Sequence, residues 1–281
     1  MLRASLLCGV LAAGCAQPGN PSRSLDDDAL SLAAAETAFA AQSVREDMRA
    51  AFLAHFASDG LFVRGGWTLA HPWLSPRPAP PIVLDWRPVH TEVAGSGELG
   101  LSTGPWKLVA RGKPEETAVF GQFVSIWRRE PGGPWKVIVD LGIGNPQPTF
   151  WQQPLEALPQ VVPGHLPSMD VQEAERQFAR VASTTGMASA YERFGSPRMR
   201  LYRDDHAPAV GKPLALVLAG DATFAWHVEQ VQTARSGDFA YARGYCASVV
   251  SGSPVAGYFM RAWRAEGGEW RIVMDVVQPA T

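Results

Sequence analysis

The first candidate for chemistry is an aspartate inside an apolar segment, Asp85 in IVLDW. His90 and Glu92 follow it, and a carboxylate near a histidine is a common proton-transfer pair. The alternative is structural. The period-two alternation of a strand places Asp85 and Arg87 on the face opposite Trp86, and an ion pair on a wetted sheet surface would explain both charges.

Two further aspartates, Asp140 and Asp275, end the apolar runs WKVIV and WRIVM. Arg64 and Arg203 hold matching places earlier in the sequence and are their natural partners. A carboxylate at such a position accepts hydrogen bonds from arginine, so the sequence favours a structural ion pair. Anion binding or catalysis is the alternative.

Aromatic and histidine side chains complete the set. Trp86 and Trp226 suit the wall of an apolar pocket, although buried core positions use tryptophan equally. His227 and Glu229 stand at alternate strand positions and would form either an acid–base pair or an ion pair across the sheet surface. Because the sequence has no Cys–His zinc spacing, no glycine-rich phosphate loop and no Gly-x-Ser-x-Gly motif, it predicts no metal site and no cofactor.

Many of these residues occur in matching pairs because the chain repeats itself. WRREPGGPWKVIVD from Trp127 returns as WRAEGGEWRIVMD from Trp263, AETAF returns as AERQF, and SGELGLSTG returns as SGDFAYARG. Self-similarity at one spacing indicates a duplicated structural unit. The repeat predicts two domains, residues 25–148 and 169–281. The proline-rich residues 149–168 between them are expected to form an extended linker without ladder pairing.

Each copy begins with a helical pattern and continues with strands. Residues 26–56 have apolar side chains near helical spacing and predict a helix or a helix pair that Asp59-Gly60 ends. A short strand, a proline-dense loop and four longer strands follow, and copy two repeats this order. We therefore predict an α+β fold of two tandem cone-shaped units, each with N-terminal helices packed under a curved antiparallel sheet. Such a sheet leaves a hollow for side chains, a ligand or a partner.

The segments AETAF, DGLFVRGG, LDWRP, SGELGLSTGPW and FGQFVSIWRREPGGPWKVIVDLGIGNPQP, in this order, resemble the SnoaL-like, nuclear-transport-factor-2-like superfamily, in a branch of unknown function. Copy two keeps only the skeleton, including Trp226, Trp263, Trp270 and Asp275. The resemblance implies the cone fold. Relatives with this fold include ketosteroid isomerase, scytalone dehydratase, polyketide cyclases and non-catalytic binding or dimerisation domains, so the fold does not choose the function.

The N-terminus is typical of an exported bacterial protein. Met1 and Arg3 precede the apolar stretch ASLLCGVLAAGC, which predicts a lipoprotein-type signal peptide over residues 1–15 with lipidation of Cys15. Cleavage before Gln17, releasing a soluble periplasmic protein, is the alternative. A formal net charge of −2 without a basic cluster argues against nucleic-acid binding.

The sequence thus predicts an envelope protein that is most simply non-enzymatic and binds a small apolar ligand or a protein partner. Its two units are expected to form an intrachain pseudo-dimer, and it would contact the membrane only through the lipid anchor. The alternative is an isomerase, dehydratase or cyclase that uses a pocket carboxylate or histidine of the first domain. The candidate pocket residues are Asp85, Trp86, His90, Asp140, Trp226, His227 and Asp275.

Overall fold

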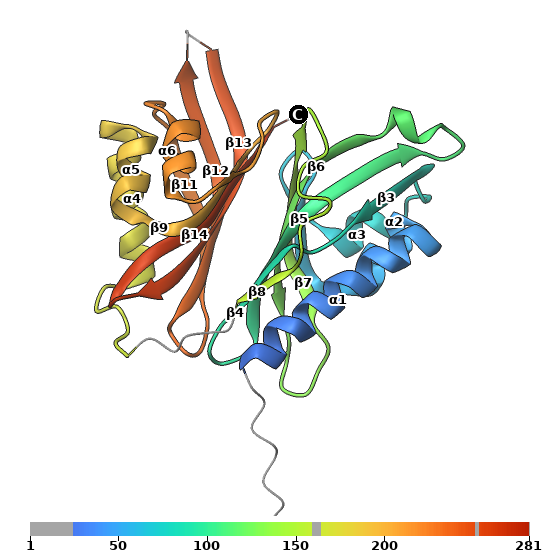
Figure 1. Ribbon diagram of the computed structural model, residues 1–281, viewed down its shortest axis with the longest axis horizontal. Coiled ribbons are helices and arrows are strands. Elements are labelled where there is room, and N and C mark those ends of the chain that lie inside the picture. The colour runs from blue at the N-terminus through green and yellow to red at the C-terminus, as the bar shows by residue number, and fades with distance from the viewer. Residues whose placement is uncertain (1–24, 159–163, 251–252, 281) are drawn as a thin grey trace, which may run out of the picture.

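The computed structural model describes residues 25–158, 164–250 and 253–280, and the predicted signal peptide with Cys15 lies outside them. The chain forms two α+β units, and their layers run helices, sheet, sheet, helices (Figure 1). We call residues 25–158 unit one and residues 164–280 unit two. Within the described residues, no helix combines the length and the apolar character needed to cross a membrane.

Unit one places three helices under an eight-stranded sheet with the order β2-β1-β7-β6-β5-β4-β8, in which β3 also pairs with β5. All of its strand pairs are antiparallel except β1 with β7 and β4 with β8. Its elements are α1 (Leu25–Arg45), α2 (Met48–His55), β1 (Phe56–Val63), β2 (Trp67–Leu69), α3 (Ala70–Leu74), β3 (Ile82–Trp86), β4 (His90–Val93), β5 (Leu99–Ala110), η1 (Glu115–Thr117), β6 (Val119–Arg128), β7 (Lys136–Asn145) and β8 (Glu156–Leu158).

Unit two repeats the plan with a six-stranded sheet of order β10-β9-β14-β13-β12-β11, in which only β9 and β14 are parallel. Gly186, with φ of 97°, separates its first two helices, as the weak middle of the helical pattern suggested. Its elements are α4 (Val171–Thr185), α5 (Met187–Phe194), β9 (Gly195–Arg203), β10 (Ala209–Val210), α6 (Lys212–Ala219), β11 (Ala225–Thr233), β12 (Phe239–Val250), β13 (Ser253–Glu266) and β14 (Glu269–Pro279).

The structure corrects several expected elements. Helix α2 ends at His55, and β1 runs through Asp59-Gly60, because the backbone N–H of Phe56 already closes the helix. Helix α6 (KPLALVLA) falls where the sequence predicted no helix; its proline sits in the first turn, where no intrahelical N–H is needed. Residues 156–158 were expected to lie in an unpaired linker, but they form β8 and pair with β4. Pro154 lies before these three residues, so it does not remove a backbone N–H from the ladder.

Three cores hold the molecule together. One fills the space between helices and sheet in unit one, a second does so in unit two, and a third lies between the two sheets. Residues of both units form this third core, among them Leu141 and Ile143 from unit one and Met260 and Met274 from unit two. Apolar area is therefore buried on both faces of each sheet, which stabilises the whole chain as one body.

Polar contacts between matching parts of the repeat also join the two sheets. The hydroxyls of Ser96 and Ser236, which occupy matching places in the repeat, lie 2.9 Å apart. The side chain of Asp238 accepts from the backbone N–H of Gly95 at 3.0 Å. The two sheets are therefore held together by these hydrogen bonds as well as by the core between them.

Candidate functional site

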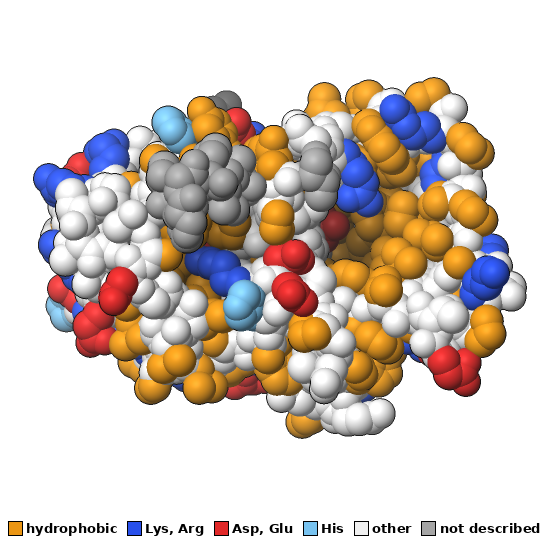
Figure 2. Space-filling model, turned by 90° about the horizontal axis from the view of Figure 1, so that it is seen from above, with side chains coloured by type: hydrophobic (Ala, Val, Ile, Leu, Met, Phe, Trp, Pro, Cys, Tyr) orange, Lys and Arg blue, Asp and Glu red, His pale blue; other side chains and the backbone are white. Residues whose placement is uncertain are grey.

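Unit one contains an open cavity of about 510 Å³ between its helices and the concave face of its sheet. Figure 2 shows this side of the molecule hollowed and lined by hydrophobic side chains, with an acidic side chain deep inside and basic ones at the rim. The cavity is lined by Glu36, Phe39, Met48, Phe52, Phe62, Val63, Arg64, Trp73, Leu74, Arg77, Pro78, Pro80, Ile82, Leu84, Trp86, Trp106, Leu108, Phe123, Ser125, Asp140, Leu141, Gly142 and, from unit two, Gln278.

Glu36 lies at the floor of this cavity because α1 turns its apolar face toward the sheet. Leu32, Glu36 and Phe39 follow one another at helical spacing and are all buried. One oxygen of Glu36 accepts from the indole N–H of Trp86 at 2.7 Å, and the other accepts from that of Trp127 at 2.9 Å. Burial raises the pKa of Glu36 to about 7, although these hydrogen bonds oppose the shift, and the charge of Asp140 adds to it.

Asp140 reaches the cavity from β7, where the strand register places it opposite Ser125 of β6. The Ser125 hydroxyl donates to Oδ1 of Asp140 at 2.7 Å. Burial raises the pKa of Asp140 to about 6, against the effects of Ser125 and of the charge of Arg64. Because the cavity opens onto it, Asp140 stays partly accessible. A carboxyl group that titrates near neutrality can either donate a hydrogen bond or take up a proton.

The equivalent place in unit two is filled. Arg261 of β13 stands opposite Asp275 of β14, as Ser125 stands opposite Asp140. Its Nε donates to Asp275 at 2.5 Å and its Nη1 donates to Glu175, the counterpart of Glu36, at 2.7 Å. The side chain of Arg261 is fully buried. Its charge therefore lies between the two carboxylates, and burial of Glu175 raises the pKa of that glutamate less than it would without Arg261.

The predicted partners of the paired aspartates behave differently in the two units. Arg203 lies 2.9 Å from Asp275 and also donates to the hydroxyl of Tyr191 at 2.7 Å. Arg64 instead donates to the carbonyl of Val63 at 2.9 Å and acts on Asp140 only at longer range. The expected structural ion pair therefore holds for Asp275, whereas Asp140 has no ion pair among the described residues.

The tryptophans of the predicted set also differ. Trp86 forms part of the cavity wall and donates to Glu36. Trp226 packs edge-to-face on Phe259 and lies under the guanidinium of Arg261, 4.6 Å from its ring centre. The indole nitrogen of Trp226 has no hydrogen-bond partner among the described residues, because Arg261 takes the place on Glu175 that Trp86 takes on Glu36.

Asp85 and His227 lie outside both sites. Asp85 is 4.0 Å from Lys107 on the outer side of β3, and its partner is that lysine instead of the expected Arg87, which donates to the carbonyl of Trp151. His227 stacks on Tyr245 at an exposed place. Glu229, expected to pair with it, contacts Arg243 at 2.7 Å, because a bulge in β11 interrupts the alternation between the two residues.

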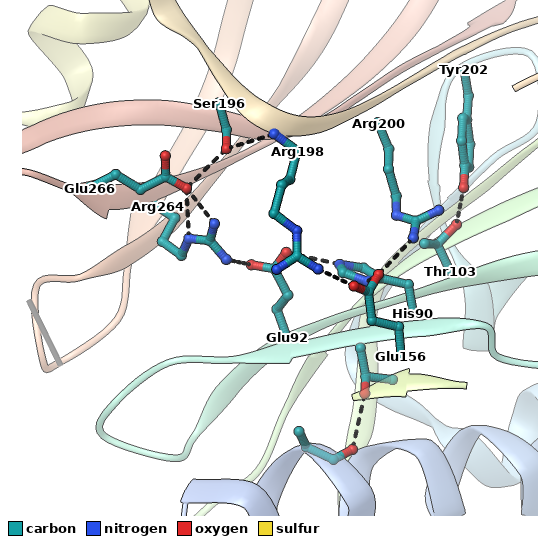
Figure 3. A network of polar contacts seen from close by, with 12 residues as sticks. His90, Glu92, Thr103, Glu156, Ser196, Arg198, Arg200, Tyr202, Arg264 and Glu266 are labelled. Carbon is teal, nitrogen blue, oxygen red and sulfur yellow. Dashed lines mark hydrogen bonds and ion pairs between the residues drawn. The ribbon is translucent and has the colours of Figure 1, made fainter. Parts of the chain in front are cut away.

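His90 lies in a network of charges between the units (Figure 3). Its Nε2 is 2.8 Å from Glu92 and its Nδ1 is 3.0 Å from Glu156, while Arg264 of unit two reaches Glu92 at 3.0 Å. The hydrogen bond from His90 lowers the pKa of Glu156 to about 2, and the charges of Arg198 and Arg200 add to the effect. His90 thus contacts the two carboxylates of unit one that pair with arginines of unit two, and it is not part of the cavity.

Sequence reasoning missed Glu36, Ser125 and Arg261. For Glu36 a signal existed, because the same glutamate recurs in AETAF and AERQF on an otherwise apolar helix face. Ser125 and Arg261 also stand in register in the repeat, two residues before Trp127 and Trp263. Their meaning depends on which residue each faces across the sheet, and this pairing becomes visible only in the structure.

No protein-family model and no curated protein sequence matches the chain. Among solved structures it is similar to an NTF-2 like protein of unknown function from Shewanella oneidensis MR-1, with 14% identity, a TM-score of 0.32, and coverage of 38% of this chain and 94% of the other. It is also similar to a ketosteroid isomerase-like protein from Erwinia carotovora atroseptica SCRI1043, with 15% identity, a TM-score of 0.34, and coverage of 40% and 94%. A third is an NTF2-like protein with a cystatin-like fold from Novosphingobium aromaticivorans, with 19% identity, a TM-score of 0.32, and coverage of 38% and 77%.

Proposed function

We propose that unit one binds a small, largely apolar molecule that carries one polar group, and that Asp140 holds this group at the floor of the cavity. The observation that carries the proposal is the difference between the units. The cavity of about 510 Å³ is open in unit one, whereas Arg261 fills the corresponding place in unit two. Apolar walls with a few convergent polar groups are typical of a ligand site.

The composition of the cavity defines the ligand further. Phe39, Trp86, Trp106 and Phe123 supply aromatic walls, so burial of an apolar body is favourable. Asp140 and Ser125 are polar groups at the floor, beside Glu36, whose two oxygens already accept from Trp86 and Trp127. A ligand group that hydrogen-bonds to Asp140 would fix the orientation of the molecule, because the aromatic walls have few other polar atoms to offer.

The test is to purify the protein from its own host envelope and to identify co-purified small molecules by native mass spectrometry. We expect one molecule per chain. The matched control is Ser125→Arg, which introduces into unit one the arginine that fills unit two, and it should lose that molecule while keeping its circular dichroism spectrum. If the same molecule remains bound to Ser125→Arg, it does not occupy this cavity and the proposal is wrong.

A second candidate function is proton-transfer catalysis of the isomerase, dehydratase or cyclase kind, and the state of Asp140 favours it. A carboxylate with a pKa of about 6 in an apolar cavity is suited to take a proton from carbon next to a carbonyl and return it. Exchange of such protons for deuterium in D₂O, followed by NMR on apolar ketones, measures this activity. It should disappear in Asp140→Asn, and equal exchange by wild type and Asp140→Asn would exclude the role.

The site of action is a further part of the proposal. The N-terminal sequence supports export to the bacterial envelope, with Cys15 as a lipid anchor or a soluble periplasmic form as the alternative. Unit two then serves as a fixed partner for unit one. It packs against the outer face of the unit-one sheet and contributes Gln278 to the cavity. Mass spectrometry of the mature N-terminus decides between the two forms, and Cys15→Ser should abolish an acylated product.

A further inference from the structure

The filled site of unit two is a guide to the kind of group that would fit the open site of unit one. The guanidinium of Arg261 donates hydrogen bonds to Glu175 at 2.7 Å and to Asp275 at 2.5 Å. Three aromatic rings surround it, with their centres at 3.7 Å for Phe178, 4.6 Å for Trp226 and 5.1 Å for Phe259. Carboxylates at the edge and aromatic faces above are a strong combination for a planar cation.

Unit one keeps these carboxylates and aromatic rings but has a serine in place of the arginine. Glu36 and Asp140 replace Glu175 and Asp275, while Phe39 and Trp86 replace Phe178 and Trp226, each in register in the repeat. Ser125 stands at the position that Arg261 occupies in unit two. Its short side chain leaves the space in front of Asp140 open.

The two sites differ in how their carboxylates are paired with arginines. Unit two balances its two carboxylates with Arg261 and Arg203. In unit one, two arginines line the cavity, but among the described residues neither forms an ion pair with Glu36 or Asp140. Arg64 lies over the ring of Phe62. The other arginine of the cavity, Arg77, lies over Trp73, 4.1 Å from its ring centre, and its Nη1 donates to the carbonyl of the same residue.

We propose that the ligand of unit one carries a guanidinium, amidinium or similar planar organic cation on a small apolar body, and that this cation takes the place of the missing arginine in front of Asp140. The inference rests on the proposed binding function and names its ligand class. The cation meets Asp140 directly. It reaches Glu36 by its charge, because Trp86 already donates to that carboxylate at 2.7 Å.

The test compares two probes of the same shape, phenylguanidinium and phenylurea, by isothermal titration calorimetry at pH 8. The first is a cation and the second is neutral. We expect phenylguanidinium to bind roughly tenfold or more tightly, as for a charge-assisted hydrogen bond with cation–π contact. Asp140→Asn should remove this preference and leave the affinity for phenylurea unchanged. Ser125→Arg should prevent the binding of both, and Asp59→Asn, an exposed acid outside the cavity, should change neither.

The pH dependence gives a second readout that does not depend on a variant. The charged groups that face the cavity are Glu36, Asp140, Arg64 and Arg77. The arginines stay charged, so the affinity for phenylguanidinium should rise between pH 5 and pH 8 as the carboxyl groups ionise, with release of protons on binding. The affinity for phenylurea should stay flat over this range.

Each other outcome overturns a defined part of the account. If phenylurea binds as tightly as phenylguanidinium, the inference of a cationic ligand is wrong, but the proposal that the cavity binds a small apolar molecule is supported. If neither probe binds while the neutral dye N-phenylnaphthylamine does, the cation inference is again wrong. If the dye fails to bind as well, the proposed binding function is wrong too.

Discussion

At the scale of single residues, the two units are distinguished by the residue opposite the paired aspartate. Ser125 leaves Asp140 facing an open cavity, and Arg261 closes the same place by contacting Asp275 and Glu175. The surrounding carboxylates and aromatic rings are shared by both units. One side chain therefore decides whether this place in a unit is open or filled.

Glu36 should make the stability of the protein depend on pH. Its pKa is about 7 in the folded chain against an ordinary 4.5, a difference that corresponds to about 3 kcal/mol. Because the folded state holds the proton more tightly, this group favours folding below pH 4.5, and the contribution is lost as the pH rises toward 7. Urea unfolding of wild type and Glu36→Gln should show a difference in unfolding free energy that changes by about 3 kcal/mol over this range.

The matched control for this prediction is Glu130→Gln, because Glu130 is highly exposed. Its unfolding free energy should follow that of wild type at every pH. A difference between wild type and Glu36→Gln that stays constant from pH 4.5 to pH 8 would mean that Glu36 ionises normally in the folded chain.

Arg261 should be required for the stability of unit two. Arg261→Met keeps an apolar stem and removes the charge, so two buried carboxylates lose a partner, and the expected loss is about 3–5 kcal/mol of unfolding free energy. Arg176→Met, in an exposed ion pair on α4, should lose less than about 1 kcal/mol. Equal losses in chemical denaturation of the two variants would show that Arg261 is not the partner of these carboxylates.

At the scale of elements, a repeated glycine shapes the sheet of each unit. A Cβ at Gly104 would lie 2.0 Å from the carbonyl oxygen of Arg87, and one at Gly244 would lie 1.9 Å from that of His227. Matching glycines thus leave room for the backbone of Arg87 in unit one and of His227 in unit two.

Gly104→Ala should therefore destabilise the chain by about 1–3 kcal/mol or more, because the obstacle is backbone and cannot rotate away. The control is Gly164→Ala, where a Cβ would meet no atom within 4 Å. Thermal unfolding followed by circular dichroism should show a lower midpoint only for the first variant. An unchanged midpoint for Gly104→Ala would contradict the close strand approach.

Much of the element order could be predicted from the sequence, because apolar periodicity and turn residues are local signals. The helix–helix break at Gly186 and the run of strands in each copy are examples. Strand β8 and helix α6 were not predictable in this way. The first depends on pairing with β4, and the second is a short apolar segment whose pattern fits a strand as well as a helix.

The candidate site was less predictable than the fold. Asp140, Trp86, Asp275 and Trp226 could be identified because they recur in the repeat. The same reasoning placed Asp85 and His90 in the candidate pocket, although Asp85 faces Lys107 and His90 contacts Glu92 and Glu156 outside the cavity. The direction of a side chain and its partner across a sheet depend on register, and a single sequence does not contain that information.

At the scale of the whole molecule, the two units share the core between their sheets. Separation would expose apolar surface on both sheets, so neither unit is expected to unfold alone. We predict a single unfolding transition in urea, with coincident midpoints for tryptophan fluorescence and far-UV circular dichroism. Two resolved transitions would show that the core between the sheets contributes little to stability.

The central claim is that the cavity of unit one is open, whereas Arg261 fills the corresponding place in unit two. The most direct measurement is the stoichiometry of N-phenylnaphthylamine binding, followed by the fluorescence of the dye in wild type and Ser125→Arg. We predict that one dye molecule binds to each wild-type chain and quenches the fluorescence of the tryptophans of unit one. The variant should bind none. Equal dye binding by both proteins would contradict the claim, because the added arginine would then leave the site unchanged.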